Sequence, residues 1–95
     1  MTSSSFQTSE TTRIEVTVRF FAAARAAAGN EEETIRIRPG TTLSGLVAQL
    51  SDRDAHLAKV LMRCSFLCDG VAVRDADMAL DNAQTIDVLP PFAGG

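Results

Sequence analysis

Hydrophobic and polar residues alternate strictly between Ile14 and Phe20. The apolar residues of this segment share one side of an extended chain and the polar residues the other: Ile14, Val16, Val18 and Phe20 against Glu15, Thr17 and Arg19. A period of two is typical of a half-buried strand. An alanine-rich stretch from Ala22 to Ala28 follows, with Gly29 just past its end. Because alanine is the best helix former and glycine commonly ends a helix, we predict a short helix here.

The middle of the chain changes from a strand pattern to a helical one. A second strand is expected from about Thr34 to Arg38, after a loop at residues 31–33, and Pro39-Gly40 marks a turn. Thr42 has the side chain of a helix N-cap. The apolar residues after it recur at helical spacing: Leu43, Leu46, Val47 and Leu50. We therefore predict one main helix, with helix resuming near Ala55.

The last third of the chain returns to strands. Asp69-Gly70 stands between two apolar runs, Phe66–Cys68 and Val71–Val73, and this pair favours the tight turn of a hairpin. A final strand is predicted from Thr85 to Leu89, ended by Pro90-Pro91, because proline cannot donate to a sheet ladder. The order of elements indicates an α+β fold. Its simplest packing is a mixed sheet of about five strands against the main helix, in two layers around one core.

Composition and charge narrow the class of protein. The 95 residues suffice for one small domain and not for two. Apolar residues make up 45% of the chain, yet no apolar run is long enough to cross a membrane. The net charge is −3 and the basic residues are scattered singly, so nucleic acid is not an expected partner. The start of the chain lacks the pattern of a signal peptide, so we expect a cytoplasmic protein.

The two ends of the chain differ from its middle. Residues 1–13 are rich in serine and threonine and nearly free of apolar residues, which predicts a disordered leader before a domain at residues 14–91. The chain ends in a tail at residues 92–95 that closes with Gly94-Gly95. Because glycine has no Cβ, such a tail can thread a narrow channel and present its terminal carboxylate to another protein's active site. The C-terminus is therefore the expected reactive group.

Other candidate side chains have simpler interpretations. Cys64 and Cys68 make no disulfide framework, and a cytoplasmic chain would keep them reduced. Either thiol could carry a persulfide, but Cys68 falls at an inward strand position, where a buried core residue is the favoured interpretation. His56 has no companion ligands and is expected at the surface. The sequence contains no nucleophile–base pair and no cluster of metal ligands.

Several segments together resemble the small subunit of molybdopterin synthase, the MoaD-like proteins of a ubiquitin-like sulfur-carrier family that also includes ThiS. Phe20–Arg25 resembles that family's first strand-to-helix segment, and Thr42–Leu50 is similar to its central helix. Asp69-Gly70 falls where the family usually has Asn-Gly. Leu89–Gly95 looks like its C-terminal signature, and the resemblance covers roughly Ile14 to Gly95.

The resemblance implies a β-grasp, ubiquitin-like fold and a sulfur-carrier role in molybdenum cofactor biosynthesis. In that family a MoeB-like activating enzyme adenylates the terminal carboxylate with ATP, and sulfur then replaces the adenylate, which here would give a thiocarboxylate on Gly95. A MoaE-like large subunit receives the tail, here Phe92, Ala93 and Gly94, and the sulfur passes to cyclic pyranopterin monophosphate. The chain itself is then expected to bind no cofactor and to catalyse nothing alone.

The face of the sheet turned away from the core is the expected docking surface. If Phe20, Cys68 and Val88 point inward, the period of two turns Phe21, Leu67 and Leu89 outward. Three apolar side chains on an exposed face suit a partner surface beside the tail. Our hypothesis is that they dock the large subunit and the activating enzyme in turn, whereas Arg25 either joins them or only solvates the short helix.

Two other functions remain open at this point. A sister sulfur carrier for thiamine or cysteine biosynthesis would use the same tail chemistry, although the segment Phe21–Arg25 argues against the thiamine carriers. A ubiquitin-like modifier or interaction module would instead join the tail to lysine, or leave it unchanged. The fate of the C-terminus separates these functions, because one fold hosts many of them.

Overall fold

The computed structural model describes residues 13–91, which fold as five strands and three helices. In chain order they are β1 (Ile14–Phe20), α2 (Ala22–Ala28), β2 (Glu32–Ile37), α3 (Leu43–Ser51), α4 (Ala55–Leu61), β3 (Ser65–Cys68), β4 (Val71–Ala72) and β5 (Thr85–Leu89). Residues 1–12 of the leader predicted at 1–13, and the tail predicted at 92–95, lie outside the described residues.

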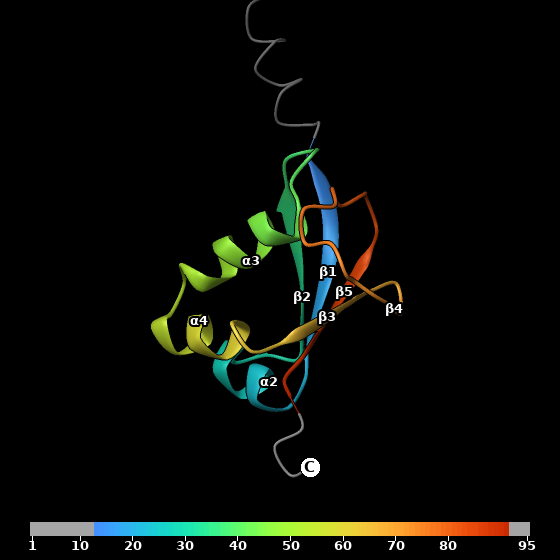
Figure 1. Cartoon of the computed structure of the whole chain (residues 1–95). Coiled ribbons are helices and arrows are strands. Elements are labelled where there is room, and N and C mark those ends of the chain that lie inside the picture. Colours follow the sequence, from blue (N-terminus) through green and yellow to red (C-terminus); the bar gives the residue numbers. More distant parts are fainter. Residues whose placement is uncertain (1–12, 92–95) are drawn as a thin grey trace, which may run out of the picture.

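The strands form one mixed sheet in the order β2-β1-β5-β3-β4. β1 is antiparallel to β2 and parallel to β5, and β3 is antiparallel to both β5 and β4. The last strand of the chain therefore lies at the centre of the sheet, hydrogen-bonded on both sides, as Figure 1 shows. The residues that follow β5 therefore leave the sheet next to its central strand and not next to an edge strand.

The three helices cover one face of the sheet and enclose the core (Figure 1). The predicted stripe of α3 faces inward, with Leu43, Leu46 and Leu50 almost fully buried. Other core side chains come from α4, from every strand except the short β4, and from the connection before β5: Val16, Val18, Phe20, Ile37, Leu57, Leu61, Cys68, Leu80, Ile86 and Val88. These observations confirm the α+β class and the predicted two-layer packing.

Local turn chemistry explains where most elements begin and end. The Thr42 hydroxyl accepts a hydrogen bond from the Gly45 amide, so Thr42 is the predicted N-cap of α3. Gly29 ends α2 with a φ of 83°, in the left-handed region where glycine carries no Cβ penalty. Asp69 and Gly70 both have positive φ, at 50° and 83°, which is the hairpin turn predicted between β3 and β4.

The predicted loop at residues 31–33 is wrong for Glu32 and Glu33, whereas Glu31 lies before the strand as expected. β2 begins at Glu32 and pairs with β1 along its whole length, from Arg19 opposite Glu32 to Ile14 opposite Ile37. Three successive glutamates disfavour a strand by propensity, but alternate side chains find different partners. Glu33 turns toward the helices, where Arg53 donates two hydrogen bonds to its carboxylate at 2.8 and 2.9 Å.

Candidate functional site

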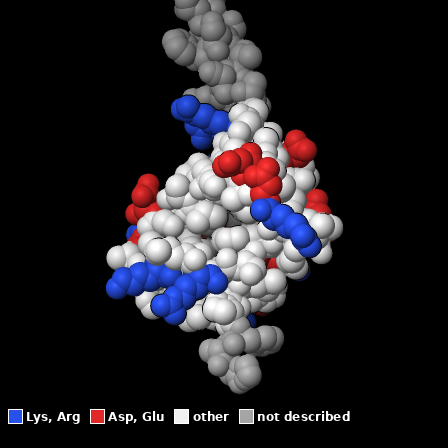
Figure 2. Space-filling model, in the orientation of Figure 1, with Lys and Arg blue, Asp and Glu red and all other residues white. Residues whose placement is uncertain are grey.

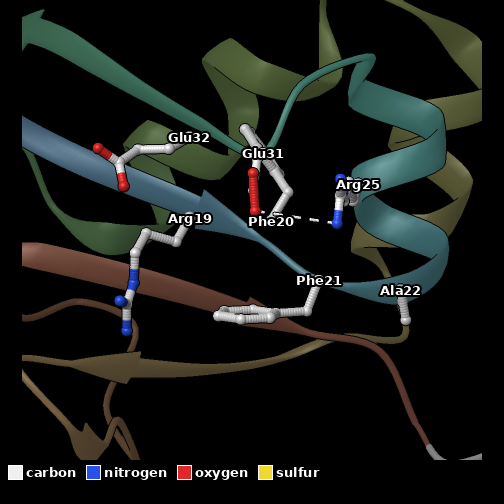
Figure 3. A pocket seen from close by; sticks show the side chains of 7 residues that line it. All are labelled: Arg19, Phe20, Phe21, Ala22, Arg25, Glu31 and Glu32. Atoms are coloured by element: carbon white, nitrogen blue, oxygen red, sulfur yellow. Dashed lines mark ion pairs between the residues drawn. The ribbon is translucent and has the colours of Figure 1, made fainter.

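The sheet face turned away from the helices carries a row of neighbouring side chains across four strands. Glu32 on β2, Arg19 on β1, Asp87 on β5 and Leu67 on β3 are cross-strand partners in register. Three charged residues of alternating sign thus stand side by side in this row, and an apolar residue follows them on β3. We call this surface the outer face, and Figure 3 shows the part of it near the end of β1.

Asp87 is the buried charge at the centre of the outer face. Asp87 as a whole residue is only 6% exposed. Its carboxylate accepts hydrogen bonds from the Arg19 Nε at 2.7 Å and from the Arg19 Nη2 at 3.0 Å. This forked geometry is the strong form of an arginine–carboxylate pair. The hydrogen bond and the charge of Asp87 raise the pKa of the Arg19 guanidinium above its usual value. Arg19 thus balances the charge of a carboxylate that lies nearly buried on the central strand.

The three predicted docking residues lie together on the outer face. Phe21 follows β1, is 39% exposed and donates its amide to the Val88 carbonyl, which brings it beside Leu89. Leu89 and Leu67 are half-buried and two residues apart across the β3–β5 register. The Arg19 guanidinium carbon lies 5.7 Å from the centre of the Phe21 ring, within cation–π range. An apolar patch therefore adjoins the Arg19–Asp87 pair.

A sharp turn between β1 and α2 holds Phe21 in this position. Ala22 begins α2 with a φ of 50°, a left-handed value that is uncommon for alanine. The chain therefore changes direction directly after Phe21. In Figure 3 the Phe21 ring extends from this turn toward Arg19, away from α2.

Arg25 lies apart from the apolar patch, on α2. Its guanidinium is mostly exposed and stands 3.9 Å from the Glu31 carboxylate, the contact dashed in Figure 3. Arg25 and Phe21 line opposite parts of one open pocket of about 520 Å³, whereas Leu67 and Leu89 do not reach it. The structure thus groups three of the four predicted docking residues and leaves Arg25 at the margin.

Both cysteines are held away from reactive chemistry by burial. Cys68 is 9% exposed and packs in the core, as predicted, and Cys64 is half-buried and donates its thiol to the Val60 carbonyl. Burial raises the pKa of both thiols, and Asp69 and Asp81 raise that of Cys68 further. Because the thiolate is the reactive form, neither side chain has the character of a persulfide carrier.

The remaining candidate residues show no further site. His56 is exposed, as expected. Within residues 13–91, no three histidine, cysteine or acidic side chains are grouped so as to hold a metal ion. No helix in that part of the chain combines the length and apolar character needed to cross a membrane.

Sequence reasoning did not single out Asp87. The signal was present, because Asp87 is the one charged residue in the otherwise apolar or small strand Thr85–Leu89. It was not decisive, since a polar residue at an outward strand position is ordinary until the strand is known to be central. Gly95 and the tail residues Phe92, Ala93 and Gly94 lie outside the described residues, so their predicted roles stay predictions.

The mixed sheet with a helical layer on one face defines a β-grasp, ubiquitin-like protein, in line with solved structures of this fold. The model of the ThiS family matches residues 18–95, and the chain belongs to that family. The predicted fold and family are thereby confirmed.

Similar proteins include both a sulfur carrier subunit and a protein modifier. The molybdopterin synthase sulfur carrier subunit of Chlamydomonas reinhardtii is 30% identical over 83 residues, which are 86% of this chain and all of that protein. The small archaeal modifier protein 1 of Methanosarcina acetivorans matches with a TM-score of 0.73 and 25% identity, over 87% of this chain and 98% of that one.

A second similar structure is a complex of two proteins. One chain in the complex of subunits 1 and 2 of the molybdopterin-converting factor from Helicobacter pylori matches with a TM-score of 0.64 and 23% identity. The match covers 86% of this chain and all of the other. At 23% identity this match supports the fold alone.

Proposed function

We propose that the protein is the sulfur-carrying small subunit of a molybdopterin synthase. The observation that carries the proposal is the 30% identity to a sulfur carrier subunit of that enzyme over 86% of this chain, in a chain that ends in Gly94-Gly95. The tail that would carry sulfur follows directly from β5, the central strand of the sheet. The folded domain would then present a short segment that ends in two glycines to its partners.

The proposed chemistry takes place at the carboxylate of Gly95. A carboxylate is a poor electrophile, so an activating enzyme first joins it to the α-phosphate of ATP and releases pyrophosphate. Sulfide sulfur then attacks the carbonyl carbon, AMP leaves, and a thiocarboxylate remains. The thiocarboxylate sulfur would attack cyclic pyranopterin monophosphate in the large subunit, with the tail residues Phe92, Ala93 and Gly94 in its channel. Water would then cleave the bond between this sulfur and the Gly95 carbonyl carbon, which leaves the sulfur on the pterin and restores the carboxylate.

The outer face is the proposed docking surface for the two partners. Phe21, Leu67 and Leu89 form a partly exposed apolar patch at the edge from which the tail leaves. The Arg19–Asp87 pair beside it leaves little net charge next to the patch. The complex of two subunits known for a structural relative supports a partner of the large-subunit type.

A protein modifier is the second candidate, supported by the 25% identity to small archaeal modifier protein 1. A modifier would form an isopeptide bond between its C-terminal glycine and a lysine of another protein. The two functions share the fold, the tail and the activation by ATP, so only the product at the C-terminus distinguishes them.

The intact mass of the chain tests the proposal directly. The purified protein is incubated with ATP, an activating enzyme and a sulfide donor, beside a matched variant lacking Gly95. We expect a mass gain equal to the exchange of one oxygen for sulfur in the wild-type chain alone. Addition of the large subunit and cyclic pyranopterin monophosphate should then restore the original mass. No gain with an activating enzyme proven on another carrier would overturn the proposal, and lysine-linked products would favour the modifier.

A further inference from the structure

A second apolar surface flanks the start of the tail, on the helical side of the sheet. It is a groove of about 560 Å³ between α2, α4 and the residues that follow β5. Its apolar wall consists of partly or fully exposed side chains: Ala23, Val60, Met62, Pro90 and Pro91. Met62 is 84% exposed, a large value for a long apolar side chain. This volume lies within the range of about 300–1,000 Å³ that is typical of binding clefts.

The ionisable residues that line the groove are all of the basic type. His56, Lys59 and Arg63 line it, and no acidic residue does. Within residues 13–91 none of the three takes part in an ion pair. Figure 2 shows basic side chains gathered over the α4 end of this view, with no acidic one between them. The local charge is thus opposite to the net charge of −3 of the whole chain.

The groove is continuous with the tail. Pro90 and Pro91 line it, and the four residues 92–95 follow them directly. Four extended residues span about 13–14 Å at most, so a protein that holds the C-terminal carboxylate lies next to the groove. Leu89, the residue before Pro90, lies on the outer face, on the opposite side of the sheet. The tail therefore begins between two apolar surfaces, one on each side of the sheet.

We infer that the groove is a second docking site, for an acidic segment of the large subunit that carries an apolar side chain between its carboxylates. The apolar side chain would lie against Met62 and the prolines, and the carboxylates would pair with Lys59 and Arg63. Charge complementarity of this kind orients a partner and speeds its approach. The inference rests on the proposed function, since it assigns the groove to the protein that receives the tail.

The test measures binding of the full chain to the large subunit from the same organism, by calorimetry, at several salt concentrations. Lys59→Glu/Arg63→Glu reverses the charge of the groove. The matched control Arg38→Glu/Arg74→Glu makes the same change in net charge at two exposed positions outside the groove. We expect the groove variant to bind about tenfold more weakly or worse, with a smaller salt dependence, and the control to stay within about threefold of wild type.

A second pair of variants tests the apolar half of the site. Met62→Asp alters the groove, and Val71→Asp is its control, because Val71 is also exposed, at 69%, but lies on β4. We expect only Met62→Asp to weaken binding, and unchanged thermal melting shows that both variants fold. Equal binding of the groove variants and their controls would overturn this inference alone. Failure of the wild-type chain to bind the large subunit would overturn the proposed function, and the inference with it.

Discussion

The guanidinium of Arg19 on β1 and the carboxylate of Asp87 on β5 form a two-point ion pair on the outer face. The two side chains differ in their surroundings, because that of Asp87 is 9% exposed and that of Arg19 is 47% exposed. Asp87 therefore depends on Arg19 for its hydrogen bonds, whereas Arg19 can turn to water. The consequence is an asymmetry between substitutions of the two partners.

Arg19→Leu should destabilise the domain more than Asp87→Asn does. The first change leaves a nearly buried carboxylate without its partner, at a cost of about 1–3 kcal/mol in the free energy of unfolding. The second leaves a half-exposed guanidinium that water can solvate. The double variant Arg19→Leu/Asp87→Leu should recover part of the loss, because two apolar side chains need no hydrogen bonds. Urea denaturation of the four proteins checks this, and a double variant less stable than Arg19→Leu would contradict it.

The apolar patch on the outer face should matter for binding and not for folding. Leu67→Asp and Leu89→Asp each place a charge among Phe21 and its neighbours, where partner contact would bury it. Because both leucines are half-buried and outside the core, we expect the domain to fold and its affinity for the large subunit to fall at least tenfold. Binding is measured by calorimetry, beside circular dichroism. Unchanged affinity in a folded variant would exclude this face as the docking surface.

Two glycine positions should respond differently to alanine. Gly29→Ala forces a Cβ into a left-handed φ of 83°, which costs about 1 kcal/mol although no atom lies within 4 Å of the new carbon. Gly45→Ala lies inside α3 and gains about 1 kcal/mol of helix propensity, offset by a contact of 3.2 Å with the Thr41 methyl carbon. We therefore expect Gly29→Ala to lower the melting temperature and Gly45→Ala to change it little. Equal losses in the two variants would be inconsistent with this account.

The buried thiols should make the domain less stable in alkaline solution. Folding raises the pKa of Cys64 and Cys68 above the value of 9.0 that they have in an unfolded chain. Their contribution is therefore fully present below pH 9.0 and is lost as pH rises through the folded pKa, because the unfolded chain ionises first. The free energy of unfolding should fall as pH rises above 9.0, and less steeply in Cys64→Ala/Cys68→Ala. Parallel pH profiles would refute this.

The sequence predicted those elements whose local pattern and tertiary role agree. The alternation at Ile14–Phe20, the N-cap at Thr42 and the turn at Asp69-Gly70 each reflect a constraint acting within a few residues. Glu32 and Glu33 were misassigned because their strand depends on pairing with β1 and on an ion pair to Arg53, twenty residues away. Local propensity contains no information about such partners.

In the candidate site, too, the residues set by local pattern could be predicted, and those set by tertiary neighbours could not. The outward positions of Phe21, Leu67 and Leu89 follow from strand period alone, so the patch could be predicted. The Asp87 pair and the groove beside Met62 depend on which strands and helices become neighbours. Sequence spacing does not encode that adjacency: Arg19 and Asp87 are separated by 68 residues, and α2 meets α4 across the whole of β2 and α3.

The central place of β5 also has a mechanical consequence. A partner that grips the tail pulls along the axis of a strand that is bonded to β1 on one side and to β3 on the other. Such a load is shared in shear by both ladders at once, whereas the same load on an edge strand would be carried by a single ladder. The domain can therefore be drawn tightly against a channel by its last residues and still remain folded.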